Sequence, residues 1–283
     1  MSKILVTGAT GNVGSRLVRR LKETGRAVRA FARDLAGKTM EEGVEAAPGD
    51  FMDKTSLQKA MDGVTAVYLL SAGDQLSVHE ANAIEAAKAA RVKLVVKHSV
   101  AGAQYNAPGF PSWHRAGEER LEASGIPYVF LRPVSFASNA LYWAGSIKDQ
   151  GTVYGALGDA AVPVIDPEDI AEAAGTVLTT PGHEGKAYEL SGPEALTTAQ
   201  QVDAIGRAVG RDLKYVNVPD DAARQSMLGL GMSPAYVEAM ISLFVMFRGI
   251  GRIEPYPNDV QTLTGHKPRS FSQWAETNAA AFQ

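Results

Sequence analysis

Short apolar segments alternate with longer amphipathic ones from residue 3 to about residue 132. The short segments are rich in Val, Ile, Leu and Phe, which is typical of strands buried on both faces of a sheet. The longer segments carry apolar residues at helical spacing, and several are followed by a glycine, which closes a helix easily. The pattern predicts strands at 3–7, 27–32, 44–47, 66–70, 93–98 and 128–132, and helices at 13–24, 54–61, 78–91 and 112–124.

Consecutive strands in this pattern are joined through helices. Such strands are expected to run parallel, with right-handed crossovers and with helices on both faces of the sheet. The predicted fold class is therefore α/β, built on a doubly wound parallel sheet.

The second half of the chain is less regular. A strand pattern returns at 186–190, and Ser233 followed by Pro234 predicts a helix start, because serine caps a helix and proline fits its first turn. We expect residues 1–150 to form the core that carries the sheet, with parts of 160–190 returning to it. Residues 191–283 are expected to form a smaller, mostly helical lobe.

The segment from Thr7 to Gly14 lies between the first predicted strand and the first predicted helix, and its glycines, Gly8, Gly11 and Gly14, are three residues apart. In a dinucleotide-binding turn the first glycine permits the tight turn, the second lets the backbone approach a diphosphate, and the third lets helix and strand pack closely. The diphosphate lies at the helix N-terminus, where N–H groups favour an anion. This context predicts a Rossmann-like sheet that binds a dinucleotide.

The end of the second predicted strand decides which dinucleotide is favoured. Arg33 lies there, and its guanidinium can make a forked contact with the 2′-phosphate of NADP. An acidic residue at this place would instead bind the 2′-hydroxyl of NAD, and Asp34 could turn inward to do so. A solvated Arg33–Asp34 pair is a third interpretation. We expect NADP(H) to be preferred over NAD(H).

The overall charge is slightly negative, with 28 Lys and Arg against 31 Asp and Glu and a net charge of -3. Such a chain has no strong positive field for a polyphosphate backbone, so we expect no nucleic-acid partner. Cysteine is absent, which excludes disulfides and thiolate chemistry and fits a reducing compartment. The first residues enter a strand pattern directly, and no apolar stretch reaches the roughly 18 residues that span a membrane. We expect a cytoplasmic protein without a leader peptide or a membrane segment.

Several further motifs are jointly specific. They are Gly49-Asp50-Phe51, Ser124-Gly125-Ile126-Pro127-Tyr128, Leu131-Arg132-Pro133, the segments 165–171 and 190–194, and Thr264-Gly265-His266-Lys267-Pro268. With the glycine turn and Arg33, they resemble the NmrA-like branch of the atypical short-chain dehydrogenase/reductases over nearly the whole chain. Within that branch the chain is similar in character to bacterial NADPH quinone oxidoreductases and to dye-reducing enzymes such as triphenylmethane reductases.

The resemblance implies a nicotinamide cofactor on the Rossmann-like core, with its reactive ring and the substrate between the core and the smaller lobe. It also implies that Asp50 and Phe51 flank the adenine. The residues expected to bind the cofactor are Gly8, Thr10, Gly11, Asn12, Val13, Gly14, Arg33, Asp50, Phe51, Ser71 and Pro133.

One departure from the wider superfamily concerns its Tyr-x-x-x-Lys motif, whose tyrosine protonates a carbonyl oxygen. Phe110 falls at the place of the tyrosine and His114 at the place of the lysine. In related phenylpropanoid reductases a lysine at that place acts on the substrate, so His114 is the best candidate for a proton donor or a hydrogen bond to substrate. The alternative is a structural histidine paired with Glu118 one helical turn later.

Ser99 follows the fifth predicted strand, where the resemblance puts the catalytic serine of the superfamily. It could orient a substrate oxygen, or it could cap a turn, which serine does often. The five histidines show no metal-ligand spacing. We therefore expect no metal, and no flavin is expected either.

Aromatic and other apolar residues crowd the loops beyond the fifth and sixth predicted strands, and more follow in the second half. They predict a flat, apolar pocket, although such residues at helical spacing also suit an ordinary core. The residues expected to contact substrate are Tyr105, Trp113, Phe136, Asn139, Trp143, Met232 and Tyr236.

Together these features predict an NADPH-dependent reductase that transfers a hydride to a flat conjugated acceptor, such as a quinone, an aromatic dye, an imine or an enone. The alternative is a non-enzymatic sensor that binds NADP(H) and acts through a protein partner, which the missing Tyr-x-x-x-Lys motif favours. The oligomeric state is left open, with a homodimer as one option.

Overall fold

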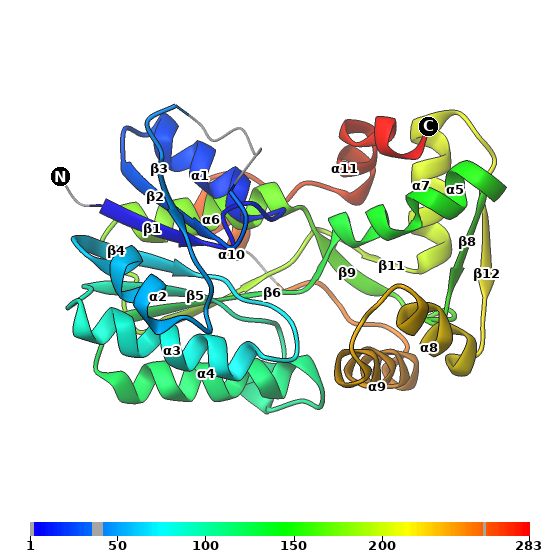
Figure 1. The fold of residues 1–283 in the computed structure, drawn as a ribbon. Helices are drawn as coiled ribbons and strands as arrows, with labels where there is room; N and C mark the ends of the chain where they lie inside the picture. Colours follow the sequence, from blue (N-terminus) through cyan, green and yellow to red (C-terminus); the bar gives the residue numbers. More distant parts are fainter. Residues whose placement is uncertain (1–2, 36–41, 257–258) are drawn as a thin grey trace.

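The structure is a computed structural model that describes residues 3–35, 42–256 and 259–283. Its centre is a seven-stranded parallel sheet with the order β3-β2-β1-β4-β5-β6-β10 (Figure 1). The strands are β1 (Lys3–Thr7), β2 (Ala27–Ala32), β3 (Glu45–Pro48), β4 (Val64–Leu69), β5 (Leu94–His98), β6 (Tyr128–Pro133) and β10 (Lys186–Leu190). The order reverses between β1 and β4, so the predicted doubly wound sheet is confirmed. Each strand expected between residues 3 and 132 is present, with ends shifted by at most two residues.

Helices cover both faces of this sheet. One face carries α1 (Gly14–Glu23), α6 (Pro167–Thr179) and α10 (Asp259–Thr264), and the other carries α2 (Lys54–Met61), α3 (Leu76–Ala89) and α4 (Phe110–Ser124) (Figure 1). Leu17 of α1 and Ile170 of α6 are fully buried on the first face, and Leu57 of α2 and Leu121 of α4 on the second. Burial of each such side chain contributes about 1.5–3 kcal/mol, which fixes the helices on the sheet.

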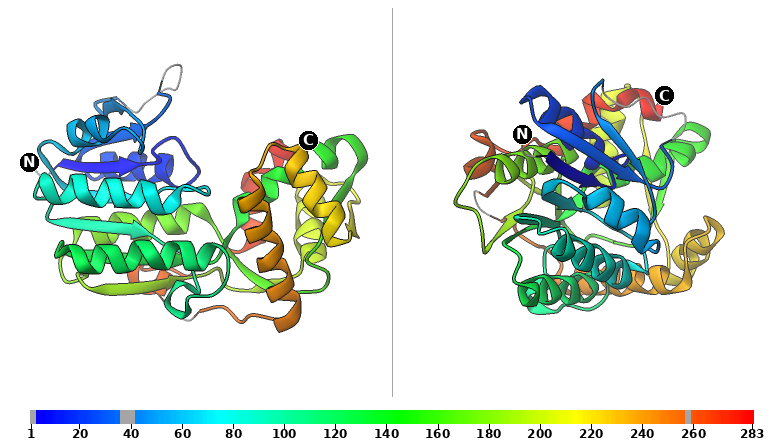
Figure 2. Two further views of the ribbon diagram at one scale, coloured as in Figure 1. Left: turned by 60° about the horizontal axis from the view of Figure 1, so that its bottom comes forward. Right: turned by 60° about the vertical axis from the view of Figure 1, so that its left-hand side comes forward.

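A second, mostly helical body faces the carboxyl ends of the strands, and the α9 helix lies on its side nearest the sheet (Figures 1 and 2). Its helices are α5 (Ala144–Gln150), α7 (Thr198–Val209), α8 (Asp220–Gly229), α9 (Pro234–Ile250) and α11 (Phe271–Thr277). Its strands are β7 (Ser135–Phe136), β8 (Thr152–Gly155), β9 (Val162–Ile165), β11 (Ala195–Leu196) and β12 (Lys214–Asn217). Ile147, Ile205 and Trp274 are buried in its own apolar cluster. The smaller, mostly helical lobe is therefore present.

The chain passes between the two bodies more than once. The short helix α10 packs against α6 and β10 of the sheet body, although it follows residue 191. The helix α5 packs against the terminal turn η3 (Ala279–Phe282), although it precedes residue 151. The division of the chain at residues 150 and 191 stays a prediction.

Two local expectations concern helix starts and membrane spans. Ser233 caps α9, because its Oγ accepts a hydrogen bond from the Tyr236 N–H at 3.3 Å, as the Ser-Pro motif predicts. Across the described residues, no helix has the length and apolar character needed to cross a membrane.

Candidate functional site

The turn after β1 is shaped by its glycines. Gly8 has a φ of +61°, and its carbonyl accepts a hydrogen bond from the Gly11 N–H at 2.9 Å. A Cβ on Gly14 would lie 2.1 Å from that same carbonyl oxygen, and such a short contact with backbone leaves room only for hydrogen. The third glycine is therefore required by the close approach of α1 to the turn.

The N-terminus of α1 is not capped by a side chain. Val13 is the N-cap residue and offers no side-chain oxygen, and the first turn of α1 contains no acidic residue. The N–H groups and positive dipole end of the helix thus face the carboxyl edge of the sheet without an internal anion. This is the arrangement that seats a phosphate group.

Thr7 joins the turn to the neighbouring strand at the place where the strand order reverses. Its Oγ1 accepts from the Leu70 N–H at 2.8 Å and donates toward the Leu70 carbonyl at 2.9 Å. Open parallel sheets bind their ligands at the carboxyl ends of the strands that flank such a reversal. The turn and the end of β4 are therefore held together at the expected ligand edge.

An aromatic platform lies beside this edge. The rings of Phe51 and His79 are stacked with centroids 5.2 Å apart and an interplanar angle of 18°. The Ser71 hydroxyl is 2.8 Å from Nδ1 of His79, and the Asn82 amide donates to the Phe51 carbonyl at 2.9 Å. Two expected cofactor residues, Phe51 and Ser71, thus both contact His79, which was not among the residues expected from the sequence.

Two expected cofactor residues, Arg33 and Asp50, are among the charged residues near the platform. Burial lowers the pKa of His79 and the charge of Arg33 adds to this, whereas the charge of Asp50 opposes it. The Arg33 side chain is exposed, and one carboxyl oxygen of Asp50 accepts a hydrogen bond from the Met52 N–H at 2.8 Å. Both residues lie where a nucleotide on the platform could meet them, and their roles stay predictions.

The remaining expected cofactor residues lie at the same edge. In the glycine turn, Val13 is buried, Thr10 is half-buried and Asn12 is exposed. Pro133 ends β6, and its carbonyl accepts a hydrogen bond from the Ala101 N–H at 2.9 Å. Contacts of these four residues with a cofactor stay predictions.

A buried ionic network surrounds Glu118. Its carboxylate accepts hydrogen bonds from Arg132 at 2.8 and 2.9 Å and from the Ser99 hydroxyl at 2.6 Å. Arg115 and Glu189 extend the network at its rim. The single proton of the Ser99 hydroxyl is therefore directed to Glu118, and a catalytic role of Ser99 stays a prediction.

The structure places His114 away from Glu118. Its Nδ1 lies 3.1 Å from Nζ of Lys97, and Lys97 also forms an ion pair with Glu80. Within the described residues the Glu118 carboxylate is bonded by Arg132, Ser99 and Arg115, and no hydrogen bond joins it to His114. Whether His114 acts on a substrate or is structural stays a prediction. Lys97 and Glu80 are two further charged residues that the sequence analysis did not select.

Some of the expected substrate residues come together. Trp113 lies edge-on to Phe110 at 5.2 Å between ring centroids, and Tyr236 lies 4.7 Å from the same ring. This aromatic cluster joins the first turn of α4 to α9 of the second body. Within α4, Phe110 lies one helical turn before His114, and Trp113 immediately precedes it.

Other expected substrate residues lie apart from this cluster. Phe136 packs edge-on against a buried histidine ring of β5 at 5.6 Å, and Trp143 packs against the apolar cluster of the second body. Tyr105 is 78% exposed, Asn139 is exposed and Met232 is half-buried. Their contacts with a substrate stay predictions.

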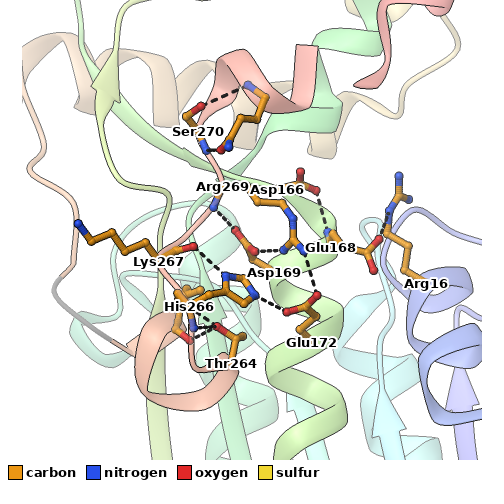
Figure 3. A network of polar contacts seen from close by, with 12 residues as sticks. Arg16, Asp166, Glu168, Asp169, Glu172, Thr264, His266, Lys267, Arg269 and Ser270 are labelled. Carbon is orange, nitrogen blue, oxygen red and sulfur yellow. Dashed lines mark hydrogen bonds and ion pairs between the residues drawn. The ribbon is translucent and has the colours of Figure 1, made fainter. Parts of the chain in front are cut away.

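A second polar cluster joins α6 to the segment that precedes α11 (Figure 3). The Arg269 N–H donates to Asp169 at 2.8 Å, and the Arg269 guanidinium bonds both Asp169 and Glu172. Glu172 also lies 2.5 Å from Nε2 of His266. These bonds fix the segment between α10 and α11, which carries the motif at 264–268.

Ligand atoms of Asp169, Glu172 and His266 lie within 4.8 Å of one another, a spacing that a metal ion can use. Here the Arg269 guanidinium holds both carboxylates. The cluster is thus accounted for as an ion-pair network, and the expectation of no metal stays a prediction.

Comparison with known proteins identifies the family. The NmrA-like family matches residues 1–277. The chain is 38% identical to a (4-alkanoyl-5-oxo-2,5-dihydrofuran-3-yl)methyl phosphate reductase of Streptomyces griseus subsp. griseus and 35% identical to an NAD(P)H azoreductase of Xenophilus azovorans, with 99% of each chain covered in both cases. The crystal structure of an NADPH-dependent quinone oxidoreductase of Escherichia coli in complex with NADPH is 28% identical, with a TM-score of 0.83 over 97% of this chain and 99% of that one. The chain therefore belongs to the NmrA-like family, and its fold is the Rossmann-type fold of this family.

Proposed function

We propose that this chain is an NADPH-dependent reductase that transfers a hydride to a flat, conjugated acceptor. The observation that carries the proposal is the glycine turn, in which Gly14 has no room for a side chain and α1 begins without a cap. The similar proteins support the reaction class, since their names describe reductases of an oxo-dihydrofuran, an azo compound and a quinone. Acceptors of these kinds share a flat conjugated system.

The residues at the carboxyl edge fit a dinucleotide. The glycine turn would hold the diphosphate at the N-terminus of α1, and the platform of Phe51 and His79 would hold the adenine, with Arg33 near the 2′-phosphate. The bound nicotinamide supplies the hydride. The protein residues position the acceptor and exclude water, and the aromatic cluster of Phe110, Trp113 and Tyr236 offers an apolar wall for it.

Turnover tests this proposal directly. Purified protein mixed with NADPH and a panel of quinones, azo dyes and enones should consume NADPH, which is followed by its absorbance. Boiled protein is the control. Binding of NADPH without consumption of it by any acceptor would contradict the proposal and favour a sensor role.

Replacement of Arg33 tests the cofactor preference. Arg33→Ala should raise the KM for NADPH by about ten- to a hundredfold, the range expected for loss of a hydrogen bond to a charged group, and should leave the KM for NADH within about threefold. Steady-state kinetics with both nucleotides give the two values. Arg207→Ala, an exposed arginine on α7, is the matched control. Equal changes for both nucleotides would remove the argument for a 2′-phosphate contact.

A further inference from the structure

A charged pair is buried inside the sheet body at the end of β5. The side chains of Lys97 on β5 and Glu80 on α3 are both 0% exposed and form an ion pair. Gly117 on α4 makes room for them, because a Cβ there would lie 1.6 Å from Oε2 of Glu80. Burial raises the pKa of Glu80, although the charge of Lys97 opposes this. A buried ion pair of this kind is weak evidence for stability, because the cost of desolvating two charges opposes their attraction.

Lys97 has a second partner, His114. Its Nζ lies 3.1 Å from Nδ1 of the imidazole, and Glu80 lies 4.0 Å from the same nitrogen. A lysine ammonium carries three donors and no acceptor, so Nδ1 must accept this hydrogen bond. In a neutral imidazole the proton is then on Nε2.

The Nε2–H group of His114 remains for a ligand. Within the described part of the chain no hydrogen bond is formed by Nε2, and the His114 side chain keeps 14% of its surface exposed. The ring lies on α4, one helical turn after Phe110 of the aromatic cluster. The neighbouring Ser99 hydroxyl donates to Glu118 instead. His114 thus offers a donor to a substrate at this edge.

We infer that Lys97 and Glu80 hold His114 in the Nε2–H tautomer, so that this ring donates a hydrogen bond to a carbonyl oxygen of the substrate. The inference rests on the proposed reductase function and assigns His114 to one class of its acceptors, the conjugated carbonyl compounds such as quinones and enones. Lys97 is a positioning residue, because it acts through His114.

Reduction of such acceptors develops negative charge on an oxygen, which a hydrogen-bond donor stabilises. When a hydride adds to a conjugated carbon, a C–H bond forms and an electron pair moves onto the carbonyl oxygen, while NADPH is oxidised to NADP+. The Nε2–H group stabilises the resulting enolate or phenolate oxygen by a hydrogen bond. Water supplies the final proton, since loss of the Nε2 proton would leave an imidazolate.

Protonated His114 is disfavoured by its surroundings. Burial, together with the charges of Lys97 and His98, holds the pKa of His114 well below its usual range. The titratable groups placed against the ring are Lys97 and His98 from β5 and Glu80 from α3. The neutral ring donates at every pH above its pKa. The stabilisation that His114 gives to the enolate or phenolate oxygen should therefore not vary between about pH 6 and pH 8.

The tautomer can be measured without turnover. In protein labelled with 15N-histidine, the His114 signals should show a protonated Nε2 and an unprotonated Nδ1 at neutral pH, and His114→Gln identifies them by their loss. The double variant Lys97→Met/Glu80→Gln should convert part of the population to the other tautomer. A wild-type ring with its proton on Nδ1, or one doubly protonated at neutral pH, would overturn the inference, whether or not the double variant folds.

The substrate class is tested by two kinds of acceptor. His114→Leu should lower kcat with a quinone by about a hundred- to a thousandfold, the usual effect of losing a donor to a developing oxyanion. His114→Gln, whose amide places an N–H near the position of Nε2, should keep a higher kcat with the quinone than His114→Leu does. Reduction of a cationic triarylmethane dye, which takes a hydride at carbon and has no carbonyl, should change by less than about threefold, because that donor has no oxyanion to stabilise.

Equal losses of kcat with quinone and dye would overturn the inference while leaving the reductase function intact. Absence of any turnover in the wild-type protein would instead contradict the proposed function, and the tautomer measurement would still decide the role of Lys97.

Discussion

Gly14→Ala should abolish measurable binding of NADPH. The added Cβ would lie 2.1 Å from the Gly8 carbonyl oxygen and 3.0 Å from Cα of Ala9, so α1 must move away from the turn. Movement of the helix displaces the N–H groups that would hold the diphosphate. Overpacking against rigid backbone also costs about 1–3 kcal/mol of folding stability. A calorimetric titration of the purified protein with NADPH measures the loss of binding.

Two other glycines provide graded controls for this result. A Cβ on Gly11 would lie 3.3 Å from the same oxygen, a milder contact, so Gly11→Ala should weaken binding less. Gly145 on α5 has open space around its Cβ position, so Gly145→Ala should leave NADPH affinity unchanged. Unaltered affinity in a folded Gly14→Ala protein would show that the phosphates are bound elsewhere.

The fold and the glycine turn are predictable from local sequence, because each depends on residues that are close along the chain. Buried strands are short runs of β-branched and aromatic residues, and the glycines that follow β1 need only the adjacent helix to explain them. For residues 132–190 the sequence does not predict clearly which segments belong to which of the two bodies. There the chain passes between the two bodies, and α5 packs against η3 at the far end of the sequence.

The residues missed by sequence analysis belong to contacts between distant segments. In the sequence His79 is one polar residue of a predicted helix. Only its stacking on Phe51, which lies in a separate loop, identifies it as a candidate site residue. Lys97 follows three apolar residues of β5, which is a signal in the sequence, but its partners come from α3 and α4. The spacing of His114 and Glu118 predicts a pair along one helix. In the structure His114 contacts Lys97 and Glu118 bonds Arg132, and both of these partners lie on strands.

Glu118→Gln should destabilise the protein by about 3–5 kcal/mol, the usual cost of removing one partner from a buried ion pair. The Glu118 side chain is 0% exposed, and both its oxygens accept hydrogen bonds from Arg132. An amide can accept through only one of these atoms, which leaves Arg132 facing a donor. Urea unfolding at neutral pH measures the difference. Glu119→Gln, the next residue on α4 but 61% exposed, is the matched control and should change the free energy of unfolding by less than about 1 kcal/mol.

The pH dependence of stability gives an independent test of the same carboxylate. Burial acts to raise the pKa of Glu118, but hydrogen bonds from Arg132 and Ser99 and the charge of Arg132 outweigh it and lower the pKa. A carboxyl with a lower pKa in the folded state stabilises the protein above its unfolded-state pKa of about 4.3, and this contribution is lost as the pH falls through the folded-state value. The difference in free energy of unfolding between wild type and Glu118→Gln should therefore be constant from pH 8 to about pH 5 and should shrink in more acidic solution. A difference that stays unchanged down to about pH 3 would show that the charge of Glu118 is not what holds Arg132.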